Sequence, residues 1–201
     1  MKNFTKDEKE QIVKDMLLAI GEDPEREGLI DTPKRVVKMW TEIFRGYDKK
    51  NVPKVTVFNN GADGIVYDSM INDEGDYYSH CEHHGVTFFG KYYFAYIPHP
   101  EGKLLGLSKV ARVVDYCAAK LQVQERLGHE IVDYLWKKLC NKRVCKFPPL
   151  GMALVLEGEH LCKTMRGVKK KGKMRTTKLI GAFKDDAKTR AEFMGWVNSR
   201  R

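Results

Sequence analysis

Two short clusters of metal-binding side chains carry the strongest chemical signal in this sequence: Cys81-Glu82-His83-His84 and His160-Leu161-Cys162. Thiolate and imidazole are the ligand types that zinc prefers in proteins. The first cluster can close around one ion at a turn. Residues two apart in a strand face the same way, so His160 and Cys162 are expected to point into one pocket. Together the clusters offer one donor more than tetrahedral zinc uses, and the surplus histidine favours a catalytic site that keeps a position open for water.

The two cluster cysteines also allow simpler interpretations. Cys81 and Cys162 could be buried free thiols, which pack as small apolar side chains, or ligands of a purely structural zinc. They could form a disulfide, but residues 1–7 lack the apolar core of a secretory signal. The five cysteines are odd in number and irregularly spaced, so we expect a cytoplasmic protein. No apolar run approaches the length of a membrane span, and no membrane partner is expected.

The charge balance points to an anionic partner. The 201 residues carry a formal net charge of +9, which suits nucleic acid or a phosphorylated small molecule. The densest basic run, residues 169–175, lacks the interleaved aromatic side chains of a single-strand binder, and a solvated basic loop explains it equally well. A hydrophobic content of 42% at this length suits one compact domain, with or without a small appended subdomain.

Several polar side chains are placed to bind a nucleotide. Ser108, Lys109 and Arg112 lie at the start of a predicted helix, where backbone N–H groups and the helix dipole favour anions. Arg166 lies four residues beyond the second cluster. The carboxylate of Glu125 could accept two parallel hydrogen bonds from guanine N1–H and N2–H. Ordinary alternatives are a solvated helix face for the basic residues and a helix-start carboxylate for Glu125.

An N-terminal arm of two helices is predicted for residues 1–50. Residues 5–8 form a capping-box sequence that starts the first helix, and residues 21–24 end it. Thr32 and Pro33 start the second helix as N-cap and first helical residue, and Gly46 ends it. The apolar positions expected to be buried in the two helices are Ile12, Met16, Leu17, Ile20, Val36, Met39, Trp40 and Ile43.

Residues 51–201 are predicted to form an α+β domain. Strands are expected where β-branched and aromatic side chains concentrate, at residues 55–58, 64–67, 91–97, 152–156 and 177–183. A helix that starts at Ser108 and another around residues 127–135 lie between them, and a short helix ends the chain. Strands before and after a pair of helices favour an antiparallel sheet with two helices on one face.

Six stretches, in order and spanning nearly the whole chain, resemble GTP cyclohydrolase I. They are residues 28–36, 79–84, 90–91, 106–112, 122–127 and 160–168. The resemblance implies that residues 51–201 are a catalytic domain of the tunnelling fold, in which the sheets of several subunits join into a ring. It also implies a homo-oligomer, a decamer of two stacked pentamers, with sites between subunits. Residues 173–178 are basic where that family usually has several threonines or serines.

The resemblance also implies a role for each site residue. Cys81, His84 and Cys162 would bind zinc, which leaves His83 and His160 for proton transfer. Glu125 and the backbone of Gln124 would hold guanine. The residues implied to surround the triphosphate are Ser108, Lys109, Arg112, Arg166 and, from another subunit, Arg35.

The implied reaction opens the imidazole ring of GTP at C8 by hydrolysis, releases formate and recloses the ring to 7,8-dihydroneopterin triphosphate. Zinc would supply hydroxide by lowering the pKa of its bound water to about 7. Alternatives are a preference for dGTP, a reaction that stops at the formamidopyrimidine, and a ring without catalysis. A nucleic-acid-binding zinc module would explain the charge but needs closed coordination, and no nucleic-acid partner is expected. The sequence leaves the pathway (folate, biopterin or deazaguanine), the subunit count and regulatory partners open.

Overall fold

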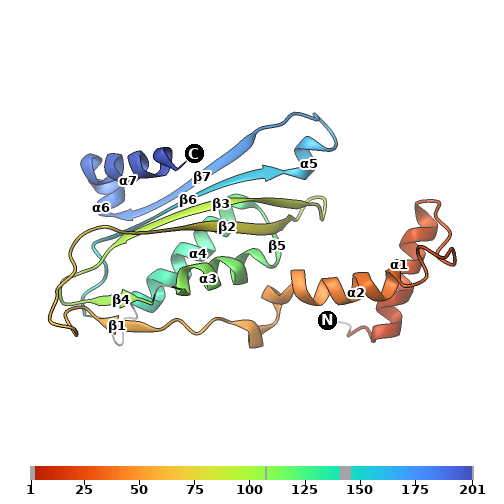
Figure 1. The fold of residues 1–201 in the computed structure, drawn as a ribbon, viewed down its shortest axis with the longest axis horizontal. Coiled ribbons are helices and arrows are strands. Elements are labelled where there is room, and N and C mark those ends of the chain that lie inside the picture. Colours follow the sequence, from red (N-terminus) through yellow and green to blue (C-terminus); the bar gives the residue numbers. More distant parts are fainter. Residues whose placement is uncertain (1–2, 107, 141–145, 201) are drawn as a thin grey trace.

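The site is built on a five-stranded sheet (Figure 1). The computed structural model describes residues 3–106, 108–140 and 146–200. Strands β2 (Ile71–Cys81), β3 (Thr87–Ile97), β6 (Gly151–His160) and β7 (Lys173–Gly181) are antiparallel neighbours in that order. A short strand, β5 (Leu121–Gln122), pairs with β2 in parallel. The metal-binding clusters therefore end two strands, β2 and β6, that flank the same strand, β3.

Helices α3 (Lys109–Ala118) and α4 (Gln124–Leu139) cover one face of this sheet (Figure 1). Their apolar residues recur every three or four positions, as in Val110, Val113 and Val114, and these pack on alternate residues of β3 and β6. The α+β class is thereby confirmed, with two helices on this face as predicted. The helices run in opposite directions, so α4 begins near β5 while α3 begins near the opposite end of the sheet (Figure 1).

The other face of the sheet is covered in part by the C-terminal helices α6 (Ala182–Asp185) and α7 (Ala187–Ser199). Phe183 and Phe193 pack there on Tyr93 and Val155. The prediction that helices lie on one face only is wrong for these two. The uninterrupted apolar runs in β3 and β6 give the physical reason, because a strand buried on both faces shows no polar alternation.

Strand β2 was not predicted from the sequence. Residues 72–76 are polar or glycine, which are depleted in strands, and pairing with β3 over ten residues overrides that preference. The predicted strand at 64–67 is instead turn and irregular structure, where the Asp63 carboxylate accepts from Ile65 N. A two-stranded sheet forms from β1 (Val57–Asn59) and β4 (Lys103–Leu105). Strand β7 starts at residue 173, so the last part of the basic stretch is strand.

The N-terminal arm consists of α1 (Lys6–Ala19) and α2 (Thr32–Ile43), which project from the rest of the chain, with α1 packed across the outer end of α2 (Figure 1). The capping box is confirmed, since Glu8 N donates to Thr5 Oγ1 and Thr5 N donates to Glu8 Oε2. Asp31, rather than Thr32, is the N-cap of α2. Two 3-10 turns, η1 (Arg45–Tyr47) and η2 (Lys49–Asn51), then lead into the sheet domain.

Four of the eight apolar residues predicted to be buried in the arm are exposed. Val13, Leu17 and Val37 are buried between the two helices, but Ile12 and Met16 are 42% and 47% exposed. Ile20 and Met39 are also exposed. Two helices that pack only on each other leave their outer faces uncovered, and this is the reason the prediction fails for a single chain. Within the described residues, no helix is long and apolar enough to cross a bilayer.

Candidate metal centre

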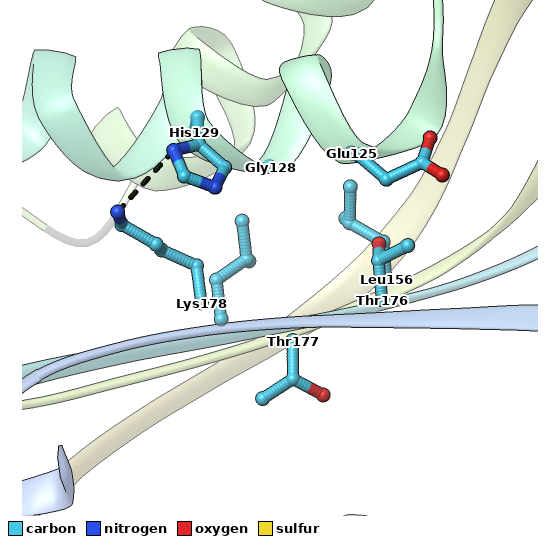
Figure 2. A pocket seen from close by; sticks show the side chains of 8 residues that line it. Glu125, Gly128, His129, Leu156, Thr176, Thr177 and Lys178 are labelled. Atoms are coloured by element: carbon cyan, nitrogen blue, oxygen red, sulfur yellow. Dashed lines mark hydrogen bonds between the residues drawn. The ribbon is translucent and has the colours of Figure 1, made fainter.

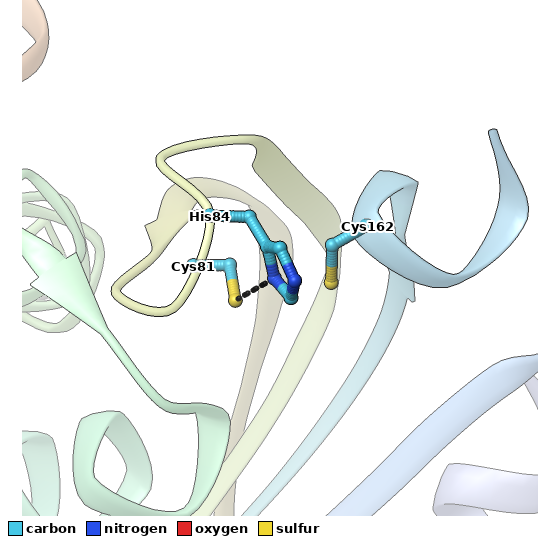
Figure 3. Close-up of side chains that lie close together, drawn as sticks. All are labelled: Cys81, His84 and Cys162. Atoms are coloured by element: carbon cyan, nitrogen blue, oxygen red, sulfur yellow. Dashed lines mark hydrogen bonds between the residues drawn. The ribbon is translucent and has the colours of Figure 1, made fainter. Parts of the chain in front are cut away.

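Three side chains from two separate strand ends meet at one point (Figure 3). Cys81 ends β2, His84 lies in the turn that follows, and Cys162 lies in the single-turn helix α5 (Leu161–Thr164) after β6. Their ligand atoms all lie within 4.8 Å of one another. The turn is closed by Gly85 N, which donates to Cys81 O at 2.8 Å, and Gly85 has a φ of 67° that favours glycine. Two thiols and one imidazole here can hold a metal ion.

The second cluster reaches this point by a different route from the one predicted. Strand β6 ends at His160, and Cys162 is helical, so the two side chains do not share a strand face. The turn of α5 brings Cys162 to Cys81 and His84 instead. His160 turns toward α4 and stacks on Phe88, with ring centroids 4.5 Å apart and an interplanar angle of 2°. His160 is therefore not part of the ligand group.

The sulfurs of Cys81 and Cys162 lie close enough to affect each other's ionisation. Burial raises the pKa of the Cys162 thiol, and the neighbouring Cys81 thiol raises it further. Two thiolates side by side repel each other, so a positive ion between them is the natural stabiliser of the deprotonated pair.

His83 lies beside the ligand group and is exposed. Its Nδ1 is 3.7 Å from Cys81 Sγ, and its ring is perpendicular to that of His84 at a centroid distance of 6.4 Å. An exposed imidazole beside a metal-binding group can exchange protons with a ligand at the same place. The structure therefore brings His83 near the metal centre but does not include it in the ligand set.

Arg166 reaches the metal centre, as its spacing from Cys162 predicted. Its Nη1 lies 2.6 Å from His84 Nε2. A guanidinium group only donates, so the imidazole nitrogen accepts, and the Nδ1 of the same ring faces Cys81 Sγ at 3.9 Å. A permanent positive charge thus stands next to the ligand group and is suited to an anionic substrate.

The start of α4 places Gln124 and Glu125 beside the same strands. Gln124 is buried, and its Oε1 lies 3.0 Å from His160 Nε2. Burial lowers the pKa of His160, while the nearby Glu125 carboxylate raises it, and burial has the larger effect. Glu125 is exposed and lies at one end of a cavity of about 210 Å³ between α4 and β7. Figure 2 shows the hydrogen-bonded pair Lys178 and His129 at the other end.

The remaining predicted contacts do not join this group within one chain. Ser108, Lys109 and Arg112 lie at the far end of α3, whose ten residues span about 15 Å at 1.5 Å per residue. The near end of α3 is fixed at the metal side, where Ser79 Oγ donates to Ala118 O at 2.7 Å. Arg35 lies on the arm and bonds to Thr32 Oγ1 at 3.2 Å.

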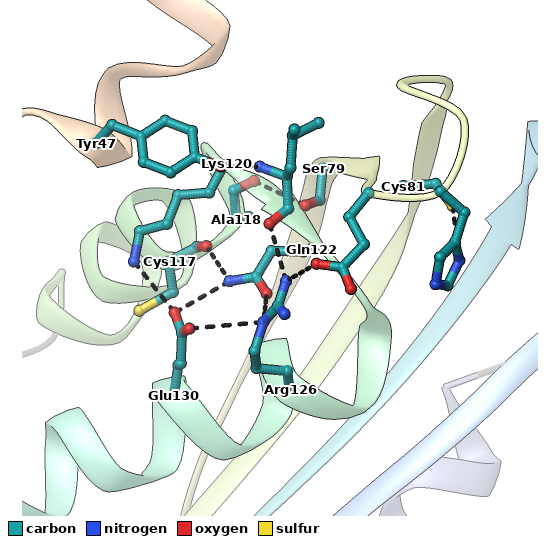
Figure 4. A network of polar contacts seen from close by, with 12 residues as sticks. Tyr47, Ser79, Cys81, Cys117, Ala118, Lys120, Gln122, Arg126 and Glu130 are labelled. Atoms are coloured by element: carbon teal, nitrogen blue, oxygen red, sulfur yellow. Dashed lines mark hydrogen bonds and ion pairs between the residues drawn. The ribbon is translucent and has the colours of Figure 1, made fainter. Parts of the chain in front are cut away.

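A polar network that sequence reasoning missed ties the metal turn to α4 (Figure 4). Arg126 donates to Glu82 Oε2 at 2.5 Å and to Gln122 Oε1 at 2.8 Å. Gln122 in turn donates to Glu130 Oε2 at 3.0 Å. The available signal was the four-residue spacing of Arg126 and Glu130, which places them on one face of α4, whereas Gln122 belongs to β5. Glu82 could not be found this way because it lies 44 residues from Arg126.

These features define a mixed α+β protein with a thiol–imidazole metal-binding group, adjacent histidines and an arginine suited to an anionic substrate. The family model described as GTP cyclohydrolase I matches residues 9–198, and the chain belongs to this family of enzymes.

Curated relatives agree with that assignment over almost the full chain. The chain is 47% identical to GTP cyclohydrolase 1 of Acetivibrio thermocellus over 191 residues, which is 94% of this chain and 95% of that protein. It is 44% identical to GTP cyclohydrolase 1 of Bacillus subtilis, with 96% of each chain covered. Archaeosine synthase QueF-Like in the apo form is similar at a TM-score of 0.37 and 14% identity, over 54% of this chain and 92% of that chain. That likeness is too low to support a conclusion. The family predicted from the sequence motifs is confirmed.

Proposed function

We propose that the protein is a zinc-dependent GTP cyclohydrolase I that converts GTP to 7,8-dihydroneopterin triphosphate and formate. The observation that carries the proposal is the convergence of Cys81, His84 and Cys162, in a chain whose family acts on GTP. Two cysteines and one histidine are a donor set that zinc prefers, and three protein ligands leave one position for water. We also infer a reducing, cytoplasmic location, which suits a site that needs Cys81 and Cys162 as thiols.

The residues around the metal centre suit the chemistry of this reaction. Zinc, when bound, would supply hydroxide at neutral pH for attack on C8. His83 would donate a proton to the imidazole nitrogen that leaves C8, so that the purine ring opens. A second hydrolysis releases formate, and His160 would carry protons during ribose rearrangement and ring closure. The triphosphate is not hydrolysed, so its binding energy is available to position C8.

Incubation of the protein with GTP tests this proposal directly. We expect stoichiometric release of formate and the ultraviolet spectrum of a dihydropterin. A ring-opened formamidopyrimidine that accumulates without formate would mean that the reaction stops early, and faster turnover of dGTP would reassign the substrate. Retention on polynucleotide at low salt without turnover would favour a nucleic-acid-binding module instead.

Glu125→Gln is expected to weaken GTP binding and to relax the choice of base. The proposed carboxylate accepts from guanine N1–H and N2–H, whereas adenine offers neither group. Glu125 is exposed in the free chain and would be buried only under a bound base. An unpaired buried polar group costs about 1–3 kcal/mol, so the wild type should prefer GTP to ATP by about tenfold to a hundredfold or more. Competition titrations of GTP and ATP on both proteins measure this.

The Glu125→Gln variant should retain its metal, since Glu125 is not in the ligand group. Glu192→Gln is the matched control, because Glu192 is an exposed carboxylate on α7. Unchanged base selectivity in the Glu125 variant would place guanine recognition elsewhere.

We further propose that residues 51–201 form a tunnelling-fold domain, that residues 1–50 form an arm, and that ten chains assemble as two stacked pentamers. Three observations support assembly. Strand β7 ends the described sheet with an unpaired edge, and such edges are usually covered. Apolar residues of the arm, such as Met16 and Met39, are exposed. The phosphate-binding candidates on α3 lie about 15 Å from the metal side of their own chain.

Light scattering should therefore give a mass ten times the 23.2 kDa of one chain. Complementation between variants tests the shared site: Cys162→Ser lacks a metal ligand, and Arg112→Ala lacks a phosphate contact. Each variant alone should be inactive, while co-expressed chains should regain part of the activity in mixed rings. An active monomer, or no regain in rings shown to be mixed, would contradict the proposal.

A further inference from the structure

The side chain of Gln124 is held in a single orientation by three acceptors. It is 1% exposed, and its Nε2 lies 3.0 Å from Leu156 O, 3.1 Å from Met174 O and 3.2 Å from Thr176 Oγ1. The two backbone carbonyls can only accept hydrogen bonds. The amide must therefore turn its NH₂ group toward them, because the reverse orientation would place its oxygen against two other oxygens. Oε1 necessarily faces the opposite side.

On that side Oε1 has two partners, Tyr77 and His160. The Tyr77 hydroxyl donates to it at 3.3 Å, and His160 Nε2 lies at 3.0 Å. An amide oxygen only accepts, so His160 Nε2 must carry a hydrogen. A neutral imidazole has one N–H, and its lone pair then lies on Nδ1. The parallel stack on Phe88 holds the ring plane in this orientation.

The sheet leaves room for this arrangement at two facing glycines. Gly90 on β3 pairs with Gly158 on β6, and Tyr77 on β2 pairs with Gly90. A Cβ on Gly158 would collide with Gln124 Oε1 and with the Tyr77 hydroxyl, which lies 2.6 Å from that position. The Gln124 amide therefore occupies a space that would be closed by any side chain at position 158. Its contact with His160 depends on this glycine.

We propose that the Gln124 side chain is a positioning residue that fixes His160 as the Nε2–H tautomer, so that Nδ1 is the atom that exchanges protons with the substrate. This inference rests on the proposed function, in which His160 carries protons. It adds a side-chain role to Gln124, for which the family resemblance implied a backbone contact with guanine.

His160 ends the cycle in the same protonation state in which it began. Nδ1 takes a proton from the substrate and becomes N–H, which gives an imidazolium ion with two N–H groups. Nε2–H keeps its hydrogen bond to Oε1 throughout, and Nδ1 then returns the proton. The opposite tautomer would set the Nε2 lone pair against the amide oxygen and would point an N–H at the substrate, where it could donate but not accept.

The first measurement uses the wild-type protein as purified, with its metal. Solid-state ¹⁵N NMR of histidine-labelled protein distinguishes the two tautomers, and His160→Asn assigns the His160 signals. We expect a protonated Nε2 and an unprotonated Nδ1 at a pH where the ring is neutral. A protonated Nδ1 with a bare Nε2 would overturn the inference, whether or not GTP is turned over. Failure to turn over GTP would contradict the proposed function without bearing on the tautomer.

The second measurement is kinetic and uses two variants. Gln124→Met removes the amide at nearly constant size and leaves the backbone in place, so we expect kcat to fall about tenfold to a hundredfold with KM for GTP little changed. Tyr77→Phe is the matched control, because it removes the other bond to Oε1 and should leave both kcat and the His160 tautomer unchanged. A Gln124→Met protein that keeps its metal and its kcat would overturn the inference. If that variant does not fold, the wild-type NMR spectrum alone decides it.

Discussion

Cys162→Ser is expected to abolish both metal binding and turnover while the chain remains folded. A serine hydroxyl does not replace a thiolate as a zinc ligand, and only Cys81 and His84 would remain of the ligand group. Cys162 lies in a single-turn helix and is only partly buried, so the loss of one sulfur should not disrupt the core. Elemental analysis should find about one zinc per wild-type chain and close to none in the variant. Circular dichroism and formate release complete the measurement.

A second cysteine provides the control for this experiment. Cys140, the C-cap residue of α4, lies outside the ligand group. Cys140→Ser should keep both metal and activity. If it also lost them, the effect of Cys162→Ser could not be attributed to the loss of a metal ligand. A metal-free wild-type preparation with full activity would contradict the assignment of a catalytic metal.

His83→Ala is expected to keep its metal and to lose turnover by a factor of about one hundred or more, the usual contribution of a general acid. The neighbouring histidine makes a sharp comparison, because His84→Ala should lose the metal itself. The expectation follows from the geometry: His84 belongs to the group of ligand atoms within 4.8 Å, whereas His83 is exposed beside it.

Metal content and single-turnover rates of both variants decide between the two histidines. If metal is lost from the His83 variant and kept in the His84 variant, ligand and acid are assigned the wrong way round. Loss of metal from both would mean that each imidazole contributes to binding, which the 3.7 Å contact between His83 Nδ1 and Cys81 Sγ would then explain.

The sequence alone was enough to predict helices with apolar residues along one face and strands rich in β-branched or aromatic side chains. The spacing of Val110, Val113 and Cys117 predicts α3, and the aromatic run of residues 91–97 predicts most of β3. Strand β2 could not be predicted, because residues 72–76 disfavour strands and only pairing with β3 makes them one. For the arm, the helices were predicted correctly, but the burial of residues such as Met16 and Met39 was not. Their helical spacing is correct, but nothing in the single chain covers that side of the helices.

The candidate site shows the same division between local and long-range information. The ligand types of residues 81–84 and 160–162 were evident from the sequence, and the resemblance selected the group that the structure brings together. The separation of His160 from Cys162 depends on where β6 ends and α5 begins, which no two-residue spacing predicts. The contact between His160 and Gln124 depends on the register of β2, β3 and β6 at Gly90 and Gly158. This register could not be predicted from the sequence.

The ligands lie at or just beyond the ends of two strands that flank a third, and this has a consequence for metal binding during folding. An unfolded chain can offer Cys81 and His84 as a local pair, but Cys162 lies across a long loop whose closure costs entropy. The full set of three ligands therefore depends on the pairing of β3 with both β2 and β6. The binding free energy of a metal ion held by all three would be added to the stability of the native state.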